Sequence, residues 1–371
     1  MKKILIDARF YGPKDTGFGR YTKNLLVHLT KLKQFKQYKF SLIVNKDQVP
    51  QIKADLKNNY QIIPTNIPHY SFKEQFTLPL IIKKLKPDLV HFPQFNKPIF
   101  CTNRSIVTVH DLIKHFYRGK LTTTKNGFLY WPKYLAYLLV SHIAIVSSNI
   151  IVPSNFWRDY LIKNFKLNPE KIITTYEAVD PTFLKTKAPT ILKPQNYILY
   201  TGNLYPHKNY SILFKAIKKL PDLTLKIICA RSVFQARAQK QAEYFGVSSQ
   251  VEFLGYLKDE DFMNVYKHAL ALVHPSFMEG FSLTGLEAMS LNCPVISSNT
   301  SCLPEIYQDS VLYFDPKKPN QLVNQIKKLR SSTKLRHNLI KRGHLQVNKY
   351  SWNKTAKLTF DFYKKSLHDN T

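Results

Sequence analysis

Acidic residues are scarce in this sequence of 371 residues, which has 24 Asp and Glu against 55 Lys and Arg and a formal net charge of +31. Residues 1–185 carry a net charge of +18 and residues 186–371 one of +13, so the excess extends over the whole chain. Nucleic acid and anionic membranes both attract such a surface. The sequence has no RNP-like, zinc-finger or basic-zipper signature, so we expect no nucleic-acid partner. A lysine-rich, solvated surface without a partner is the alternative.

Cysteines and long apolar runs are also few. The four cysteines form no C-x-x-C pair, which favours buried free thiols in a reducing compartment over a disulfide or a zinc site. The apolar run that begins the chain breaks at Asp7 and Arg9, too early for a signal peptide, and it predicts a buried strand. The longest apolar stretch, 134–146, is shorter than the roughly 18 residues that cross a bilayer. We therefore expect a cytoplasmic protein, or one peripheral to the inner face of the cytoplasmic membrane.

Apolar segments alternate with amphipathic ones along the chain, a pattern typical of parallel α/β sheets. The expected strands of the first half are 2–8, 39–44, 87–92, 104–111 and 149–154, and its expected helices include 17–32 and 128–148. The alternation restarts later, with strands expected at 196–203, 223–230, 250–255, 269–276 and 293–298 and helices at 208–220, 232–245 and 320–330. The fold class is therefore α/β.

Between the two halves lies a stretch with two prolines and no periodicity, residues 186–195, which is the best candidate for a linker. The sequence thus predicts two Rossmann-like domains, 1–185 and 196–348. In doubly wound sheets of this kind, ligands bind at the carboxyl ends of the strands. Polar residues at those ends are accordingly the candidates for a functional site.

Two strand ends carry such residues. In the segment 274–290, Glu279 lies in the loop after an expected strand and Glu287 follows inside the next helix. The intervening backbone precedes a helix N-terminus, where N–H groups and the helix dipole favour phosphate. Lys208, after another strand, can present a positive charge to a diphosphate. Taken alone, these residues also fit a surface lysine and ordinary glutamates near a helix start.

A family resemblance gives this pattern a more specific meaning. Residues 279–287, EGFSLTGLE, resemble the E-x7-E motif of the retaining GT-B glycosyltransferases of family 4, also called group 1. Other landmarks follow that family's order over nearly the whole chain: GFGR at 17–20, VHD at 109–111, VPSNF at 152–156, GNLYPHKN at 202–209, PVISSN at 294–299 and F-x2-Y at 360–363. The resemblance implies two Rossmann-like domains facing across a cleft, with a C-terminal helix in 349–371 packing back on the first domain.

The resemblance also implies roles for individual residues. Lys208 would hold the donor diphosphate and stabilise the leaving nucleotide. Glu279 would contact the donor sugar, Glu287 would accept the ribose hydroxyls, and His110 would lie beside the donor sugar. The family is independent of metal, so the resemblance implies no metal site and no cofactor besides the nucleotide-sugar donor, linked to GDP or UDP.

Backbone groups complete the implied donor site. Gly17 and Gly19 would let the first loop approach the phosphates and the acceptor. The amides that would help to hold the phosphates and the sugar belong to Gly280, Phe281, Ser282 and Leu283.

One departure from the family concerns the charge at the diphosphate. Many relatives carry an arginine where this sequence has Asn203, so the phosphate site is one cation short. Arg231, at the end of its own strand, is a candidate replacement, and His207 beside Lys208 is another. We expect Asp111 to orient its loop and not to act as a base. The GN-L-x-P-HKN variant is similar to that of mannosyltransferase-like members.

The expected function is therefore retaining, metal-independent transfer of a hexose, with mannose from GDP-mannose the first choice. The acceptor would be a glycan or a lipid-linked sugar in the synthesis of a cell-surface polysaccharide. A UDP-sugar-dependent glucosyl- or N-acetylglucosaminyltransferase of the same fold is one alternative. The others are a non-catalytic GT-B binding subunit, a phosphorylase and an epimerase.

An anionic membrane surface is the further partner that the sequence predicts. Residues 114–137 interleave six basic residues, His115 included, with seven aromatic ones. Aromatic rings favour the headgroup region, and basic residues gain about 1 kcal/mol each near anionic lipid. In the alternative interpretation, Phe128, Tyr130, Trp131 and Tyr134 form the buried side of a helix.

Overall fold

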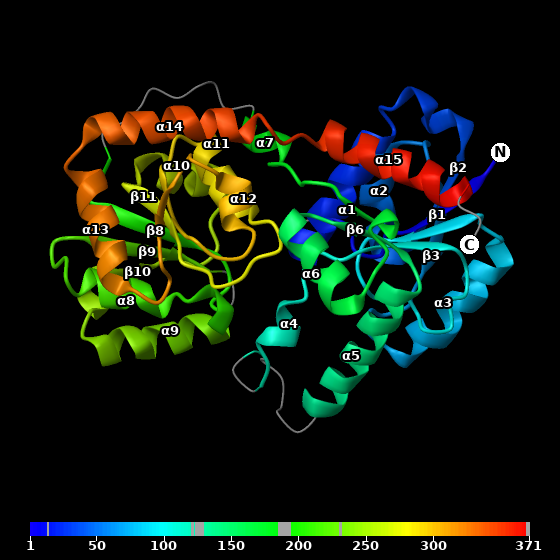
Figure 1. The fold of residues 1–371 in the computed structure, drawn as a ribbon, viewed down its shortest axis with the longest axis horizontal. Coiled ribbons are helices and arrows are strands. Elements are labelled where there is room, and N and C mark those ends of the chain that lie inside the picture. The colour runs from blue at the N-terminus through cyan, green and yellow to red at the C-terminus, as the bar shows by residue number, and fades with distance from the viewer. Residues whose placement is uncertain (13–14, 120–121, 123–129, 185–193, 230–231, 369–371) are drawn as a thin grey trace. The chain divides into compact units, whose positions relative to one another are not determined.

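The computed structural model describes residues 1–12, 15–119, 122, 130–184, 194–229 and 232–368, and the chain divides into two compact units (Figure 1). The first contains residues 1–112, 131–177 and 351–371, and the second contains 113–130 and 178–350. The second unit thus takes in the segment after Leu112, which the sequence placed in the first domain. Most of the expected linker 186–195 lies outside the described residues.

The first unit is built on a parallel sheet with the strand order β3-β2-β1-β4-β5-β6-β7. Its strands are β1 (Lys3–Asp7), β2 (Lys39–Asn45), β3 (Gln61–Thr65), β4 (Leu89–Phe92), β5 (Ser105–Thr108), β6 (Asn149–Val152) and β7 (Ile172–Thr174). Every residue of β4 and β5 is buried, as expected of central strands that are covered on both faces.

Helices cover both faces of this sheet. They are α1 (Thr16–Leu29), α2 (Val49–Leu56), α3 (Phe72–Leu85), α5 (Tyr130–Val146), α6 (Asn155–Phe165) and α15 (Trp352–His368), with short 3-10 turns at Lys33–Gln37, Lys46–Gln48 and Pro169–Lys171. Right-handed crossovers place α1 and α2 on one face and α3, α5 and α6 on the other.

The C-terminal helix α15 packs on α1 within the first unit. From it, the Tyr363 hydroxyl lies 2.6 Å from Nδ1 of His91 on β4, and Nε2 of that histidine lies 2.9 Å from the Thr108 hydroxyl on β5. Phe360 and Tyr363, the two ends of the F-x2-Y landmark, are both buried. The landmark therefore has a structural explanation, because it anchors the end of the chain to the first sheet.

The second unit repeats the architecture with the strand order β10-β9-β8-β11-β12-β13, again all parallel. Its strands are β8 (Tyr197–Thr201), β9 (Thr224–Ile228), β10 (Val251–Phe253), β11 (Ala271–His274), β12 (Val295–Ser298) and β13 (Leu312–Phe314). Its helices are α4 (Ile113–Phe116), α7 (Pro181–Leu184), α8 (Ser211–Ile217), α9 (Ser232–Phe245), α10 (Asp259–His268), α11 (Leu283–Ser290), α12 (Leu303–Tyr307), α13 (Pro319–Arg330) and α14 (Thr333–Val347), with 3-10 turns at Pro206–Lys208 and Ser248–Gln250.

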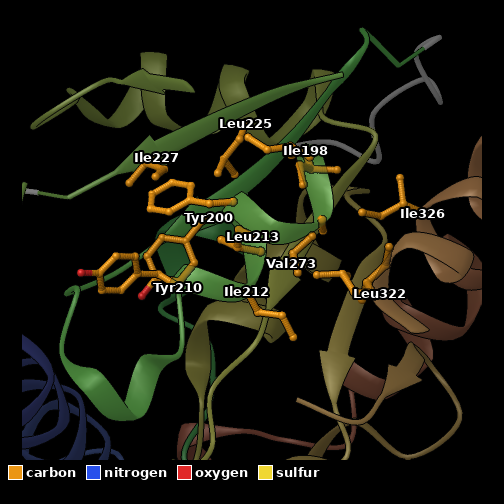
Figure 2. Packing of buried hydrophobic residues seen from close by; sticks show 14 of the residues in the cluster. Ile198, Tyr200, Tyr210, Ile212, Leu213, Leu225, Ile227, Val273, Leu322 and Ile326 are labelled. Atoms are coloured by element: carbon orange, nitrogen blue, oxygen red, sulfur yellow. The ribbon is translucent and has the colours of Figure 1, made fainter. Parts of the chain in front are cut away.

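One face of this sheet packs against helices to form an apolar core. Figure 2 shows strand side chains such as Ile198, Leu225 and Val273 meeting Leu213 of α8 and Ile326 of α13. These five side chains have at most 1% of their surface exposed. The core fixes the strands whose carboxyl ends carry the polar residues.

The strand order of the second sheet reverses between β8 and β11. These two strands are neighbours, with Ala271 paired to Ile198 and Leu272 to Leu199. The connection after β8 leads to β9 on one side of this pair, and the connection after β11 leads to β12 on the other side. Such a reversal leaves adjacent loops open at the carboxyl edge, where doubly wound folds bind ligands. The loop after β8 carries Lys208 and the loop after β11 carries Glu279.

Candidate functional site

Lys208 and Glu279 form a direct ion pair at this strand-order reversal. The Lys208 Nζ lies 2.7 Å from Oε1 and 2.8 Å from Oε2 of Glu279. Two further contacts tie the loops together: the Asn209 side-chain amide donates to the Pro275 carbonyl at 3.1 Å, and the Phe277 N–H donates to the His207 carbonyl at 2.8 Å. Residues 71 positions apart in the sequence are therefore held together as one site.

His274 is a member of this site that we did not predict. It is the last residue of β11. Its Nε2 lies 2.9 Å from Glu279 Oε1 and 3.2 Å from the Ser282 hydroxyl. The signal that could have identified it is the one used for His110, a histidine at the carboxyl end of a buried strand.

The electrostatic state of Glu279 follows from these neighbours. Burial alone would raise its pKa, but the charge of Lys208 and the hydrogen bond from His274 outweigh burial, and the pKa is lowered well below 4.5. Glu279 is therefore ionised at neutral pH. An ammonium group has three protons. Lys208 directs two of them to this carboxylate, and the third can donate to an oxygen of a bound ligand.

The backbone after Glu279 turns sharply into α11. Ser282 is the N-cap of that helix and has φ +79°, in the left-handed region. The Phe281 side chain is buried and packs edge-on against the Tyr350 ring, with 5.4 Å between centroids. The Cys302 thiol contacts the Glu279 carbonyl at 3.3 Å. These contacts, together with the helix that starts at Leu283, hold the backbone between Gly280 and Leu283 in a compact turn.

Glu287 lies inside α11, on the same helix that this turn begins. It is buried, with 7% of its surface exposed. The helix therefore carries the second carboxylate of the E-x7-E motif at a fixed distance along its axis from the turn.

His207 does not replace the positive charge that is missing where this sequence has Asn203 in place of an arginine. Burial and the adjacent Lys208 lower the pKa of His207 to about 4, so its ring is uncharged at neutral pH. The ring stacks on Tyr205, with centroids 5.8 Å apart, and lies 5.7 Å from that of Tyr117. The Asn203 carbonyl accepts a hydrogen bond from Tyr200 at 2.7 Å. Arg231, the other candidate cation, lies outside the described residues.

His110 lies in the first unit, after β5, and both of its ring nitrogens meet acceptors. Nδ1 is 3.0 Å from Glu177 Oε1, and Nε2 is 3.0 Å from the Pro93 carbonyl. Because a carbonyl can only accept, Nε2 donates, and a contact between a ring N–H and the donor sugar would have to replace one of these bonds. Glu177 is a second residue that we did not predict. Asp111 is half-buried.

Gly17 and Gly19 lie in the first turns of α1, not in a loop. Gly19 has a packing explanation, because a Cβ atom there would lie 2.1 Å from the Gly12 carbonyl oxygen. A Cβ atom on Gly17 would meet nothing within 4 Å. The absence of a side chain at Gly19 therefore serves the contact between α1 and the preceding chain.

Comparison with solved structures identifies the fold. A glycosyltransferase from Rickettsia africae superposes with a TM-score of 0.70 at 17% identity, over 100% of this chain and 99% of that one. Anabaena Alr3699/HepE in complex with UDP gives a TM-score of 0.71 at 15% identity, over 98% and 100% of the two chains. Two Rossmann-like units with such neighbours define the GT-B fold.

Comparison with known sequences identifies the family. The model for Glycosyltransferase Family 4 matches residues 16–183, and that for Glycosyl transferases group 1 matches residues 184–346. O-antigen chain mannosyltransferase B of Escherichia coli is 28% identical over 378 residues, covering 94% of this chain and 96% of the relative. O-antigen chain mannosyltransferase RfbU of Salmonella typhimurium is 29% identical over 231 residues, covering 60% and 62%. The chain belongs to the group 1 glycosyltransferases, and it is a glycosyltransferase.

Proposed function

We propose that this enzyme transfers a hexose, with mannose from GDP-mannose as the first choice, to a glycan or lipid-linked acceptor, with retention of anomeric configuration. The observation that carries the proposal is the contact of Lys208 with Glu279 at the strand-order reversal. A nucleotide-sugar joins a diphosphate directly to a sugar. A cation and a carboxylate that touch each other suit that junction, with the cation on the phosphates and the carboxylate on the sugar hydroxyls.

In the proposed mechanism, Lys208 binds the diphosphate and stabilises the charge that develops as the glycosidic bond breaks. The turn from Gly280 to Leu283 adds backbone N–H groups and the positive end of the α11 dipole. Glu279 accepts hydrogen bonds from the sugar, and Glu287 accepts those of the ribose. Cell-surface polysaccharide synthesis is proposed as the setting because two relatives are named O-antigen mannosyltransferases.

The donor preference can be tested by incubating the purified enzyme with a panel of GDP- and UDP-sugars and measuring release of the nucleoside diphosphate and glycosyl transfer. We expect turnover with one nucleotide series, GDP-mannose giving the fastest release. Fastest turnover with a UDP-sugar would replace the donor while retaining the enzyme class. Sugar phosphate formation in the presence of phosphate would indicate a phosphorylase, and binding without turnover a binding subunit.

We further propose that the enzyme works at an anionic membrane surface, held there by one face of the first unit. Three exposed residues follow each other at helical spacing along α3: Phe72 with 87%, Phe76 with 58% and Leu80 with 67% of their surface exposed. Helix α5 repeats the pattern, and its exposed apolar side chains include Trp131, Leu135 and Leu139. Solvent-exposed apolar rows of this kind on a helix favour an interfacial location.

Helices α3 and α5 lie on the same side of the first sheet (Figure 1). The connection after β4 contacts α3 and the residue just after α5. The Phe100 ring packs against Phe76 with centroids 5.1 Å apart, and the Lys97 Nζ donates to the Ser147 hydroxyl, just after α5, at 2.9 Å. Exposed lysines on the same helices are Lys73, Lys83, Lys84 and Lys133. Their charge complements an anionic bilayer and argues against an apolar protein partner.

The structure separates the aromatic residues that the sequence grouped together. Trp131 is 55% exposed and Tyr134 is buried, with 8% exposed. Tyr134 therefore belongs to the packed side of α5, and Trp131 to the proposed membrane surface. Phe128 lies outside the described residues. No helix in the described parts of the chain has the length and the apolar character needed to cross a membrane.

Sedimentation with liposomes tests this surface. We expect binding to rise with the fraction of anionic lipid and to fall with ionic strength, because charge supplies part of the attraction. A Phe72→Ser, Phe76→Ser, Leu80→Ser variant should lose binding, whereas Tyr244→Ser, an 85% exposed aromatic residue of the second unit, should not. Equal sedimentation of both variants, or no binding to strongly anionic liposomes at low salt, would remove the membrane proposal and leave the transferase unaffected.

A further inference from the structure

The turn between the two motif glutamates contains an unfavourable backbone conformation. Ser282 has φ +79° and ψ +70°, in the left-handed region that residues with a Cβ atom rarely adopt. Such a conformation is strained and persists only where its surroundings hold it. The residue lies between Glu279 and the start of α11, where the donor phosphates are proposed to bind. What holds it is therefore relevant to the site.

Tyr307, the last residue of α12, holds Ser282 through its hydroxyl group. The Tyr307 side chain is completely buried. Its Oη donates to the Ser282 carbonyl at 3.0 Å, lies 2.6 Å from the Ser282 Oγ, and accepts from the Gly285 N–H at 3.2 Å. A phenol has one proton and two lone pairs. The three contacts use all of them if Ser282 Oγ donates to the tyrosine.

The same assignment extends to the ion pair. With its own proton given to Tyr307, the Ser282 Oγ accepts from His274 Nε2 at 3.2 Å. The same Nε2–H also points to Glu279 Oε1 at 2.9 Å, and Glu279 contacts Lys208. One hydrogen-bonded chain therefore runs from the buried Tyr307 through Ser282, His274 and Glu279 to Lys208, the proposed phosphate-binding lysine. In this chain each N–H or O–H group donates and each carbonyl, carboxylate or hydroxyl oxygen that it meets accepts.

Gly285 makes room for this arrangement. A Cβ atom at that position would lie 2.3 Å from Oη and 2.4 Å from Cζ of Tyr307. Atoms at these distances would clash, and the ring of a buried tyrosine has no room to move aside. Ser282, Gly285 and Tyr307 therefore depend on one another: the glycine admits the tyrosine, and the tyrosine supports the serine.

We propose that Tyr307 is a positioning residue for donor binding, whose hydroxyl keeps Ser282 in the left-handed conformation and, through Ser282 and His274, sets the orientation of Glu279. This inference rests on the proposed function, in which the Glu279–Leu283 turn binds a nucleotide-sugar. It assigns to α12 a function that the E-x7-E segment alone does not indicate.

The test compares Tyr307→Phe with Tyr197→Phe. Both changes remove one buried tyrosine hydroxyl from the second unit, but the Tyr197 hydroxyl donates to the Val265 carbonyl, away from the site. Each protein is titrated with GDP and with UDP. For the nucleotide that binds the wild type, the dissociation constant should rise about tenfold in Tyr307→Phe and less than about twofold in Tyr197→Phe. The KM for the donor should rise similarly, with kcat changed less than about threefold.

A second substitution makes the test specific for the backbone. Glycine adopts positive φ without strain, so Ser282→Gly should not need the tyrosine hydroxyl. In a Ser282→Gly background, Tyr307→Phe should weaken nucleotide binding by less than about threefold. A full tenfold loss in that background, or unchanged affinity in Tyr307→Phe alone, would overturn the proposal.

Hydrogen exchange separates this inference from the proposed function, because it needs no ligand. In the free enzyme, exchange of the backbone amides at 281–286 should be faster in Tyr307→Phe than in wild type, and Tyr197→Phe should leave it unchanged. Faster exchange in an enzyme that binds neither GDP nor UDP would support the hydroxyl's hold on the turn while overturning the proposed donor site. Unchanged exchange would overturn the positioning role itself.

Discussion

Replacing Lys208 with alanine is expected to lower glycosyl transfer at least about 100-fold while the protein stays folded. The lysine is the cation that contacts Glu279, and loss of one preorganised charge at a developing anion costs about 3–4 kcal/mol of transition-state stabilisation. His207 cannot compensate for the lost charge, because burial lowers its pKa to about 4 and its ring is uncharged at neutral pH. Steady-state transfer with the preferred donor measures the effect, and a thermal unfolding curve checks the fold.

The matched control for this variant is Lys218→Ala. Lys218 is an exposed lysine at the end of α8, on the helix that follows Lys208. Its loss should change activity by less than about twofold, as for other surface substitutions. Activity of Lys208→Ala within about threefold of wild type would refute the role of Lys208.

Glu279→Gln is expected to reduce both activity and stability. The change leaves the Lys208 charge without its carboxylate at a site where Glu279 is only 6% exposed. Breaking a buried pair from one side costs about 3–5 kcal/mol, and the partial exposure of Lys208 puts our expectation near 2–3 kcal/mol. Transfer should fall at least about 100-fold, because the proposed sugar contact is lost. Urea unfolding and transfer kinetics measure the two effects.

The stability effect should depend on pH with a definite sign. The pKa of Glu279 is lowered in the folded protein below its ordinary value of 4.5. The ionised carboxylate therefore stabilises the fold fully at pH values above 4.5. This contribution is lost as the pH falls through the lowered pKa of the folded state. The stability gap between wild type and Glu279→Gln should thus narrow below pH 4.5. The control is the pair of Lys226 and Glu252, whose carboxylate side chain is 53% exposed, and Glu252→Gln should cost less than about 1 kcal/mol. Equal costs for the two variants would contradict our account.

Much of the second unit could be predicted because its strands are apolar and end in polar residues. The Lys208 and Glu279 loops were placed at strand ends, and the order of the strands then brought them into contact. The prediction of a helix at 208–220 was wrong about where the helix starts. A 3-10 turn covers Pro206–Lys208, Asn209 takes a left-handed conformation with φ +52°, and α8 begins at Ser211. The Asn209 side chain bonds to two carbonyls from other loops, which no local pattern shows.

Glu177 and Tyr307 were not predictable for the same reason, because each contacts a site residue that comes from another loop or helix. His274 lies at the end of a buried strand, which is a sequence signal, but its contacts with Glu279 and Ser282 form only in the fold. Tyr307 in particular lies in a short helix and contacts Ser282, 25 positions away. The exposed face of α5 was equally hidden, because its 17 residues include a single charged side chain and resemble a buried helix.

The anomeric configuration of the transferred sugar tests the central claim most directly. Transfer from the preferred donor should be run with EDTA present, and the new linkage assigned by NMR. Because Lys208 is proposed to replace a metal ion, we expect full activity in EDTA and a product that keeps the α configuration of the donor. An inverted product, or activity that depends on added Mn²⁺, would contradict the proposed retaining, metal-independent mechanism.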